Sequence, residues 1–209
     1  MVAKDFRQAA WQKMSGNWGV YALINLIILV ISSVCDSLTY GILFIILTGP
    51  FTLSIAYCSL TVSNNQDIKV EDAFIGFQDF VRSFFAYIIN SIFIFLWSLL
   101  LIIPGIIKTL SYSMTFFILQ EDKNISANDA RKLSMEMMNG YKWKLFCLYF
   151  SFIGWILLSI LTFGILFLWI SSYMDVAKAE FYKNIKAEKG ITVGNSTPSE
   201  EAQPTEEKE

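Results

Sequence analysis

Two charged residues interrupt apolar stretches of this chain, and they are its first candidates for binding chemistry. Asp175 lies about 11 residues after Gly164, or roughly 16 Å along a helix. If Gly164 marks a membrane surface, this carboxylate lies near the middle of the bilayer, where a charge is costly and usually functional. Lys108 is the single charge between Ser83 and Gln120. We expect these two residues, if any, to line a path for a small solute or lipid.

Each charge also has a purely structural explanation, and the sequence leaves both explanations open. The uncharged run from Ile165 to Met174 is only ten residues long. The last apolar segment can therefore be tilted or shallow, with Asp175 at the start of a cytoplasmic extension that pairs with Lys178 at i+3. Lys108 can be an anchor, because its long side chain reaches back to the lipid headgroups.

No constellation for catalysis or metal binding is recognisable in the sequence. Histidine, the commonest acid–base residue and metal ligand, is absent. The motifs G-x-S-x-G, H-E-x-x-H, C-x-x-C and the phosphate loop are also missing. The cysteines Cys35, Cys58 and Cys147 are far apart and lie in or beside apolar runs, which is typical of packing residues. We predict no enzymatic activity, no cofactor, no metal and, without a dense basic face, no nucleic-acid partner.

Long apolar segments must position the few charges. The 209 residues are 55% hydrophobic and only 16% charged, whereas soluble domains have about 25% charged residues. No charge occurs in 14–35, 37–66, 83–107, 109–120 or 145–174. A transmembrane helix needs about 20 apolar residues, and at least three of these runs are long enough alone. The composition predicts an all-α integral membrane protein.

A proline–glycine pair divides the longest apolar stretch. A helix from Arg82 to Gln120 would be about 58 Å long, which is about twice the thickness of the hydrocarbon core. Pro104 lacks an N–H group and disfavours helix in the residue before it. Gly105 permits a tight reversal of the backbone. We therefore predict a helical hairpin whose tip is Pro104–Gly105.

Short matching sequences predict that this hairpin is one of three. LTYGILFI at 38–45 and LTFGILFL at 161–168 are identical at six of eight positions, and MSGNW at 14–18 aligns with MNGYKW at 138–143. Apolar composition alone can also produce such matches. We predict one membrane domain over residues 1–189, built from hairpin units at about 1–62, 63–122 and 123–189. The six transmembrane helices would turn at Gly41, at Pro104–Gly105 and at Gly164.

The charges predict how this domain is oriented. Lysine and arginine concentrate before the first span, between the second and third, between the fourth and fifth, and after the sixth. The positive-inside rule then places both termini in the cytoplasm. The acidic, polar segment 190–209 is predicted to be a disordered cytoplasmic tail.

The cytoplasmic connections are predicted to contain short amphipathic helices. Residues 121–140 are the clearest case, with Ser126 and Asp129 as a capping-box-like start and Gly140 as the C-cap. Segments 3–14 and 70–80 are weaker examples. Such helices can cap the hairpins or rest on headgroups. The alternative is a partner-binding role for the methionine-rich face, which comprises Met135, Met137 and Met138.

Four phrases together resemble a known family: GNW near the start, IPGIIKTLSYSM, FILQED and FIGWILLSILTFGILFLW. The chain is similar over about 5–185 to a domain-of-unknown-function family of multi-pass membrane proteins from Gram-positive bacteria. That family tends to have Pro-Tyr where this chain has Ser172-Tyr173, which removes a kink. More distantly, the hairpin pattern is similar to the membrane domain of some glycerophosphodiester phosphodiesterases. The resemblance implies a bacterial plasma-membrane location and no settled activity.

Two functions are compatible with these features. The first is a non-enzymatic protein that protects or organises the plasma membrane, for example in antimicrobial-peptide immunity or as an exporter accessory. Its partners would be membrane lipids, and either a membrane protein or a second copy of the chain. The alternative is a carrier or channel for a small solute or lipid, with Asp175 and Lys108 along the path.

Overall fold

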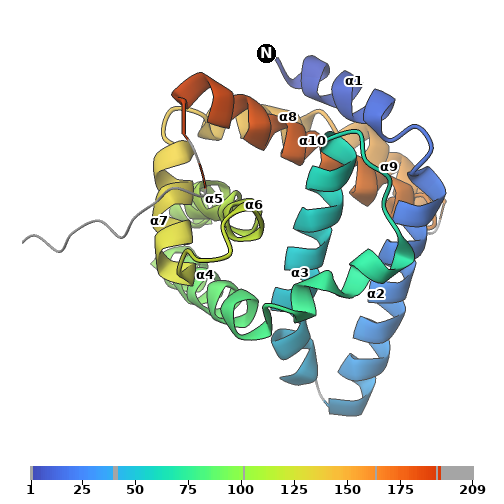
Figure 1. Cartoon of the computed structure of the whole chain (residues 1–209), viewed down its shortest axis with the longest axis horizontal. Coiled ribbons are helices and arrows are strands. Elements are labelled where there is room, and N and C mark those ends of the chain that lie inside the picture. Colours follow the sequence, from blue (N-terminus) through green and yellow to red (C-terminus); the bar gives the residue numbers. More distant parts are fainter. Residues whose placement is uncertain (1, 40–41, 101, 163, 192, 194–209) are drawn as a thin grey trace, which may run out of the picture.

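The computed structural model describes residues 2–39, 42–100, 102–162, 164–191 and 193, with the side chains of 35–39, 42–44, 100 and 102 excepted. All regular elements in this part of the chain are helical, which confirms the all-α class (Figure 1). They are α1 (Ala3–Lys13), α2 (Trp18–Thr39), α3 (Ile42–Ser63), the 3₁₀ helix η1 (Val70–Phe77), α4 (Phe80–Leu100), α5 (Ile102–Tyr112), α6 (Thr115–Glu121), α7 (Ala127–Met137), α8 (Lys142–Phe150), α9 (Ile153–Leu161) and α10 (Phe167–Lys189).

The two matching segments 14–18 and 138–143 form the same turn. In both segments the methionine is fully buried. The glycine two positions later has a positive φ, +92° at Gly16 and +86° at Gly140. The N–H three residues after the methionine donates to its carbonyl, at 2.9 Å in the first segment and 3.1 Å in the second. A left-handed glycine ends one helix in each case and redirects the chain into the next.

Helices α4 and α5 pack against each other as an antiparallel pair. Lys108 lies 4.9 Å above the Trp97 ring, and a Cβ at Gly105 would lie 3.0 Å from the Cα of Ser98. Pro104 and Gly105 are inside the first turns of α5, after the reversal, rather than at its tip. Proline is tolerated there because the first N–H groups of a helix have no intrahelical acceptor. Gly105 instead allows the close contact between the two helices.

The other two predicted hairpin tips are Gly41 and Gly164. Gly41 lies outside the described residues. Gly164 lies between α9 and α10, with φ +82°. Its N–H donates to the carbonyl of Ser159 at 2.8 Å, which closes the end of α9.

The number of helices suited to crossing a membrane is smaller than six. Among the described residues, three helical segments are long and apolar enough: Ile45–Ser63, Phe80–Leu99 and Lys142–Leu161. A fourth is obtained if α1 and α2, which meet at 98°, count as one broken span. Six spans are therefore not confirmed. The 11-residue α5 and 7-residue α6 are separate short helices, and α10 carries charges along its second half.

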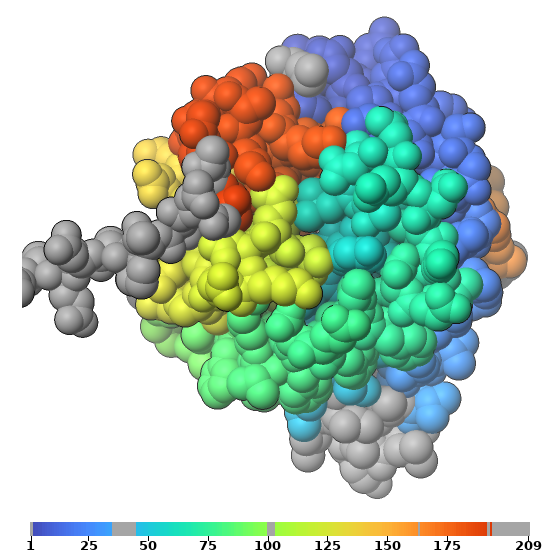
Figure 2. Space-filling model, viewed as in Figure 1, coloured from blue at the N-terminus to red at the C-terminus, as the bar shows by residue number. Residues whose placement is uncertain are grey.

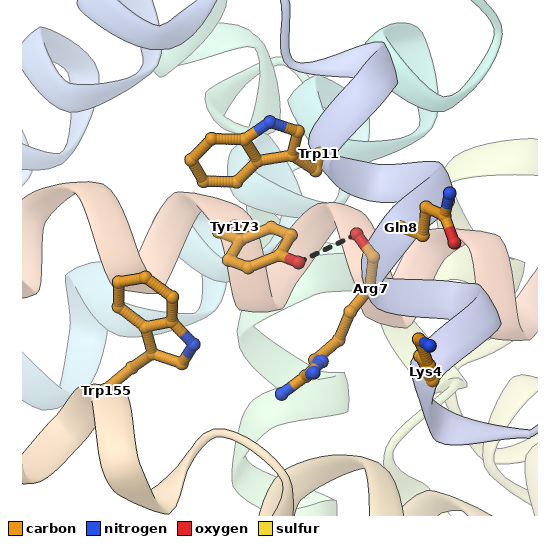
Figure 3. Close-up of a pocket in the computed structure, with 6 residues that line it drawn as sticks. All are labelled: Lys4, Arg7, Gln8, Trp11, Trp155 and Tyr173. Atoms are coloured by element: carbon orange, nitrogen blue, oxygen red, sulfur yellow. Dashed lines mark hydrogen bonds between the residues drawn. The ribbon is translucent and has the colours of Figure 1, made fainter.

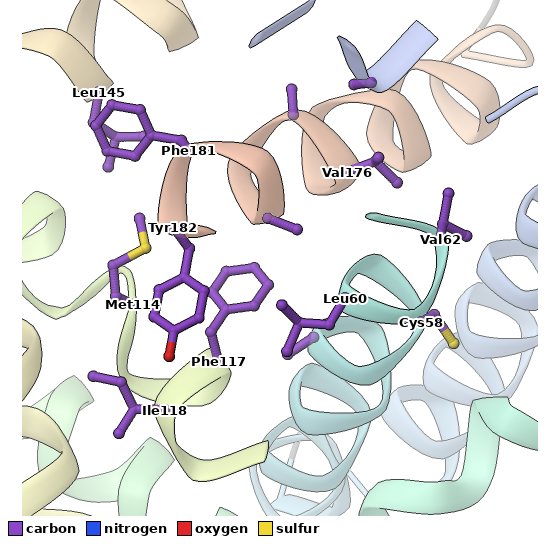
Figure 4. Packing of buried hydrophobic residues seen from close by; sticks show 14 of the residues in the cluster. Cys58, Leu60, Val62, Met114, Phe117, Ile118, Leu145, Val176, Phe181 and Tyr182 are labelled. Atoms are coloured by element: carbon purple, nitrogen blue, oxygen red, sulfur yellow. The ribbon is translucent and has the colours of Figure 1, made fainter. Parts of the chain in front are cut away.

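Helix α3 is the central element, in contact with α2, η1, α4, α6 and α10. One part of the core lies where α10 and α6 meet the end of α3 (Figure 4). There Phe117 stacks on Tyr182 at 5.4 Å, near the buried Leu60. In the space-filling view, α1, α10 and the α3–η1 region form one continuous surface (Figure 2).

Two candidate spans expose most of their apolar side chains. Only 17% of the α4 window and 22% of the α8–α9 window is buried inside the protein, against 61% for α3. A soluble monomer rarely exposes apolar side chains along most of the length of a helix. The exposed side chains include Phe95, Leu96 and Leu99 on α4 and Leu157, Ile160 and Leu161 on α9. These surfaces indicate association with a membrane.

Candidate functional site

Two adjoining hollows lie between α1, the start of α2, α9 and α10, and we call them together the aromatic groove. The first hollow has a volume of about 590 Å³ and is lined by Lys4, Arg7, Gln8, Trp11, Trp155 and Tyr173 (Figure 3). The second, of about 380 Å³, is lined by Trp11, Trp18, Trp155, Leu166, Trp169, Ile170 and Tyr173. The hollows share Trp11, Trp155 and Tyr173, so one end of the groove is basic and the other is apolar.

Four helices, α1, α2, α9 and α10, position the aromatic side chains. Tyr173 of α10 donates its hydroxyl to the carbonyl of Arg7 at 2.8 Å, which fixes α1 across α10 (Figure 3). The bend between α1 and α2 brings the ring centre of Trp18 to 5.0 Å from that of Trp11. The ring centres of Trp11 and Tyr173 are 5.7 Å apart. Four of the six tryptophans in the chain line this groove. Tryptophan and tyrosine collect at the membrane–water interface, where one end of the ring system is apolar and the other is hydrated.

The basic end of the groove contains two cations without an acidic partner among the described residues. The Arg7 guanidinium donates through Nη1 to the carbonyl of Ser151 at 2.8 Å and lies 5.9 Å from the Phe152 ring centre. Its Nε is buried and has no hydrogen-bond partner in the described part of the chain. Lys4 is exposed at the rim, and none of the described carboxylates lines either hollow. Burial raises the pKa of Tyr173, and the positive charge of Arg7 partly opposes this effect.

Asp175 lies on α10 near the ends of α2 and α3. Its charge acts on Tyr21 and Cys58. Tyr21 is three residues inside the start of α2, and Cys58 is five residues before the end of α3. These separations correspond to about 5 and 8 Å. Burial raises the pKa of Asp175 to about 6, and Lys178 partly opposes this effect. Asp175 therefore lies close to Tyr21 near the start of α2 and to Cys58 near the end of α3.

The same end of the helices carries further charges. Lys13 forms an ion pair of 2.6 Å with Glu180, and the Glu180 carboxylate also accepts a hydrogen bond of 2.5 Å from Ser63. Lys183 donates to the carbonyl of Ser63 and to the side chain of Asn64, both at 2.9 Å. The second half of α10 therefore lies across the end of α1 and the end of α3.

Lys108 and Asp175 are not brought together in the described structure. Lys108 lies over Trp97 and 6.0 Å from the ring centre of Tyr112, so its aromatic partners belong to its own hairpin. Asp175 interacts with residues of α2, α3 and α10. The geometry of Lys108 is that of an anchored cation.

Of the three methionines at the end of α7, Met135 is half-buried and the other two are buried. Ser126 caps α7 by accepting the N–H of Asp129 at 3.1 Å, so the predicted start of this helix is confirmed. Met137 and Met138 are fully buried in the core. They pack the protein interior and are not exposed for a partner.

The residues of the aromatic groove are the ones that sequence reasoning missed. Each tryptophan alone looks like an ordinary interfacial residue, and Arg7 looks like a surface charge. The available signal was the grouping of tryptophans near both ends of the chain. In the described part of the chain, no three histidine, cysteine, aspartate or glutamate side chains converge as metal ligands.

Comparison with models of protein families finds a match that covers most of the chain. One family model matches residues 1–111 and 98–189, which include every residue that lines the groove. The chain belongs to the family described as "Protein of unknown function (DUF975)". This confirms the predicted membership of a domain-of-unknown-function family. No curated protein and no solved structure matches the chain, so the more distant similarity to glycerophosphodiester phosphodiesterases is not shown.

Proposed function

We propose that this DUF975 protein is a non-enzymatic, multi-pass protein of the bacterial plasma membrane that protects or organises the bilayer. It does so by holding lipid-like amphiphiles in the aromatic groove. The observation that carries this proposal is the groove itself, which joins a basic end to a wholly apolar and aromatic end. A ligand that fits both ends has a polar head and an apolar tail.

The proposed membrane placement puts the groove at the cytoplasmic interface. Helix α1 is amphipathic and meets α2 at 98°, as expected of a helix that lies on the headgroups before the chain enters the bilayer. We retain three hairpins with both termini in the cytoplasm as the proposed topology. In this topology α10 reaches only part-way into the membrane, because its charged half is bound to Lys13 at the end of α1 and to Ser63 at the end of α3.

The positive charge of the groove favours one of two ways to protect the membrane, which are capture of the peptide itself and rearrangement of the lipids. Membrane-active peptides are commonly cationic, and the head of the groove carries Lys4 and Arg7. Like charges repel, so direct capture of a cationic peptide is disfavoured at this site. Protection through the arrangement of lipids is therefore the form that we propose.

A carrier or channel is the second candidate function. The apolar and basic ends of the groove also suit a protein that moves a lipid between environments. The described structure does not join Lys108 to Asp175, so the groove replaces them as the binding part of this alternative. Transfer of labelled lipid between the leaflets of reconstituted vesicles would support the carrier.

The test is survival of a bacterial host with and without the gene across a panel of membrane-active peptides. We expect selective sensitivity of the deletion strain, rescued by wild-type protein and by Trp143→Ala, but not by Trp155→Ala. Trp143 is 72% exposed and lies outside the groove, so it is the matched control. Equal survival of deletion and wild-type strains would contradict the protective role. Rescue by Trp155→Ala at normal protein levels would show that the groove is not needed.

A further inference from the structure

We infer that the aromatic groove selects phospholipids with a net negative headgroup, whose phosphate is bound by Arg7 and Lys4. This inference rests on the proposed function and adds to it the charge of the ligand. It depends on three observations: the unused donors of Arg7, the absence of a compensating carboxylate among the described residues, and the continuity of the basic end with an apolar channel.

The Arg7 guanidinium has unused hydrogen-bonding capacity. It offers five N–H donors, and its one hydrogen bond in the described structure is from Nη1 to the carbonyl of Ser151. Nε is buried without a partner among the described residues. The Nε groups of Arg82 and Arg131 are likewise buried and unpartnered, so the capacity that matters at Arg7 is that of its Nη groups. Arginine binds phosphate oxygens through parallel N–H groups, and the Nη groups retain donors for such a contact.

The positive charge at this end also has no acidic partner within the described part of the chain. Arg131 shares this feature and lies over aromatic rings, whereas two lysines elsewhere are paired. Lys13 and Lys186 are both partly buried, and each pairs with a glutamate, at 2.6 and 2.5 Å. The acidic side chain adjacent to Lys4 in sequence, Asp5, is used locally and accepts the N–H of Val2 at 2.9 Å. The charge that would balance Arg7 and Lys4 is therefore expected from a ligand.

The shape of the groove assigns the remaining parts of the ligand. From the Arg7 end, the shared Trp11, Trp155 and Tyr173 lead to a hollow lined by Trp18, Leu166, Trp169 and Ile170. A phosphate at Arg7 places the glycerol beside the shared aromatic rings and an acyl chain along the apolar hollow. A zwitterionic headgroup would add an ammonium close to two cations, so the groove favours an anionic headgroup.

The experiment measures lipid retention by native mass spectrometry of the full-length protein in mixed micelles. Phosphatidylglycerol competes with phosphatidylcholine of the same acyl chains. We expect wild-type protein to prefer phosphatidylglycerol by about tenfold, because the choline ammonium of phosphatidylcholine would lie close to the Arg7 and Lys4 cations. Arg7→Gln should abolish most of this preference. Lys4→Gln should reduce it, and Lys4 is exposed, so that variant is expected to fold normally.

A matched control and a soluble competitor complete the design. Lys69→Gln removes an exposed lysine outside the groove and should leave the preference unchanged. Glycerol phosphate should not displace the lipid at concentrations that lipid competitors do. Displacement by glycerol phosphate alone would overturn the assignment to a lipid.

The outcomes separate the inference from the function on which it rests. Equal retention of both lipids, with both weakened by Trp169→Ala, would overturn the charge selection and leave the amphiphile groove intact. No lipid retention that depends on Trp169 would contradict both. A preference that survives Arg7→Gln and Lys4→Gln together would place the headgroup elsewhere and overturn the inference.

Discussion

At the scale of single residues, Gly76 is where two backbones touch. A Cβ at this position would lie 2.1 Å from the carbonyl oxygen of Pro50 in α3, and the Gly76 N–H donates to Ser54 Oγ at 2.9 Å. No side chain can relieve such a contact, so η1 or α3 must shift. We expect Gly76→Ala to lower the free energy of unfolding by about 1–3 kcal/mol. Gly154→Ala is the control, because a methyl group at that position would have no described atom of another segment within 4 Å.

Thermal unfolding of the two variants in the same detergent measures the difference. The glycine in α9 is in an open helical position, where alanine is favourable. We expect Gly154→Ala to unfold at or slightly above the wild-type temperature. Equal unfolding temperatures for both variants would contradict the close contact of η1 with α3.

Asp175 gives a prediction with a defined dependence on pH. Burial raises its pKa to about 6 in the folded protein, above the usual value near 4 of an unfolded chain. The ionised carboxylate therefore destabilises the fold, fully above pH 6 and not at all below pH 4. We expect Asp175→Asn to raise the free energy of unfolding by about 1–2 kcal/mol at pH 8, after allowance for partial exposure. The gain should disappear as the pH falls through this window.

The titratable groups around Asp175 determine whether the pH dependence can be assigned to Asp175 itself. Tyr21, Cys58 and Lys178 are the titratable groups that interact with Asp175 in the described structure, and none of them titrates between pH 4 and 6 in an unfolded chain. Unfolding temperatures of wild type and Asp175→Asn, compared from pH 4 to 8, test the prediction. A constant difference across this range would show that Asp175 stays ionised.

At the scale of elements, local sequence predicts some helix ends and not others. The start of α7 is encoded within four residues by Ser126 and Asp129, so it is predictable. The predicted C-cap, Gly140, is wrong by two residues: Met138 is the C-cap, and the left-handed Gly140 follows it in the turn to α8. The break between α5 and α6 depends on a distant side chain. Ser134 of α7 donates to the carbonyl of Ser111 at 2.8 Å and accepts the N–H of Met114 at 3.2 Å. The residues around 113 contain no signal for this contact with Ser134. The sequence therefore predicts one long helix across α5 and α6.

Ser134 is therefore expected to hold the break between the two helices. Its replacement by alanine leaves a buried N–H and a buried carbonyl without their partner, at a cost of about 1–3 kcal/mol. We expect Ser134→Ala to lower the unfolding temperature clearly. Ser113→Ala is the control, because its hydroxyl bonds within its own turn to Leu110. A control variant as unstable as Ser134→Ala would argue against a specific role of the α7 serine.

At the scale of the whole molecule, composition predicts the class of protein but not the site. The apolar runs are sufficient to predict helices that suit a membrane. The groove depends on α1 folding back over α10, which brings Arg7 and Trp11 to Tyr173 and Trp155 from the other end of the chain. The pattern of apolar residues within either helix does not predict this contact between α1 and α10. The number of spans is hard to predict for a related reason, since the break at 113–114 depends on Ser134 of α7.

The most direct test of the proposed function is where the groove lies in a bilayer. In a variant with Trp97→Phe and Trp143→Phe, all remaining tryptophans line the groove. This variant is reconstituted into vesicles whose lipids carry bromine at defined depths, and tryptophan fluorescence is recorded. We predict strong quenching by bromines near the headgroup end of the acyl chain and weak quenching by those at its terminus. Absence of quenching, or strongest quenching at the terminus, would contradict an amphiphile groove at the membrane interface.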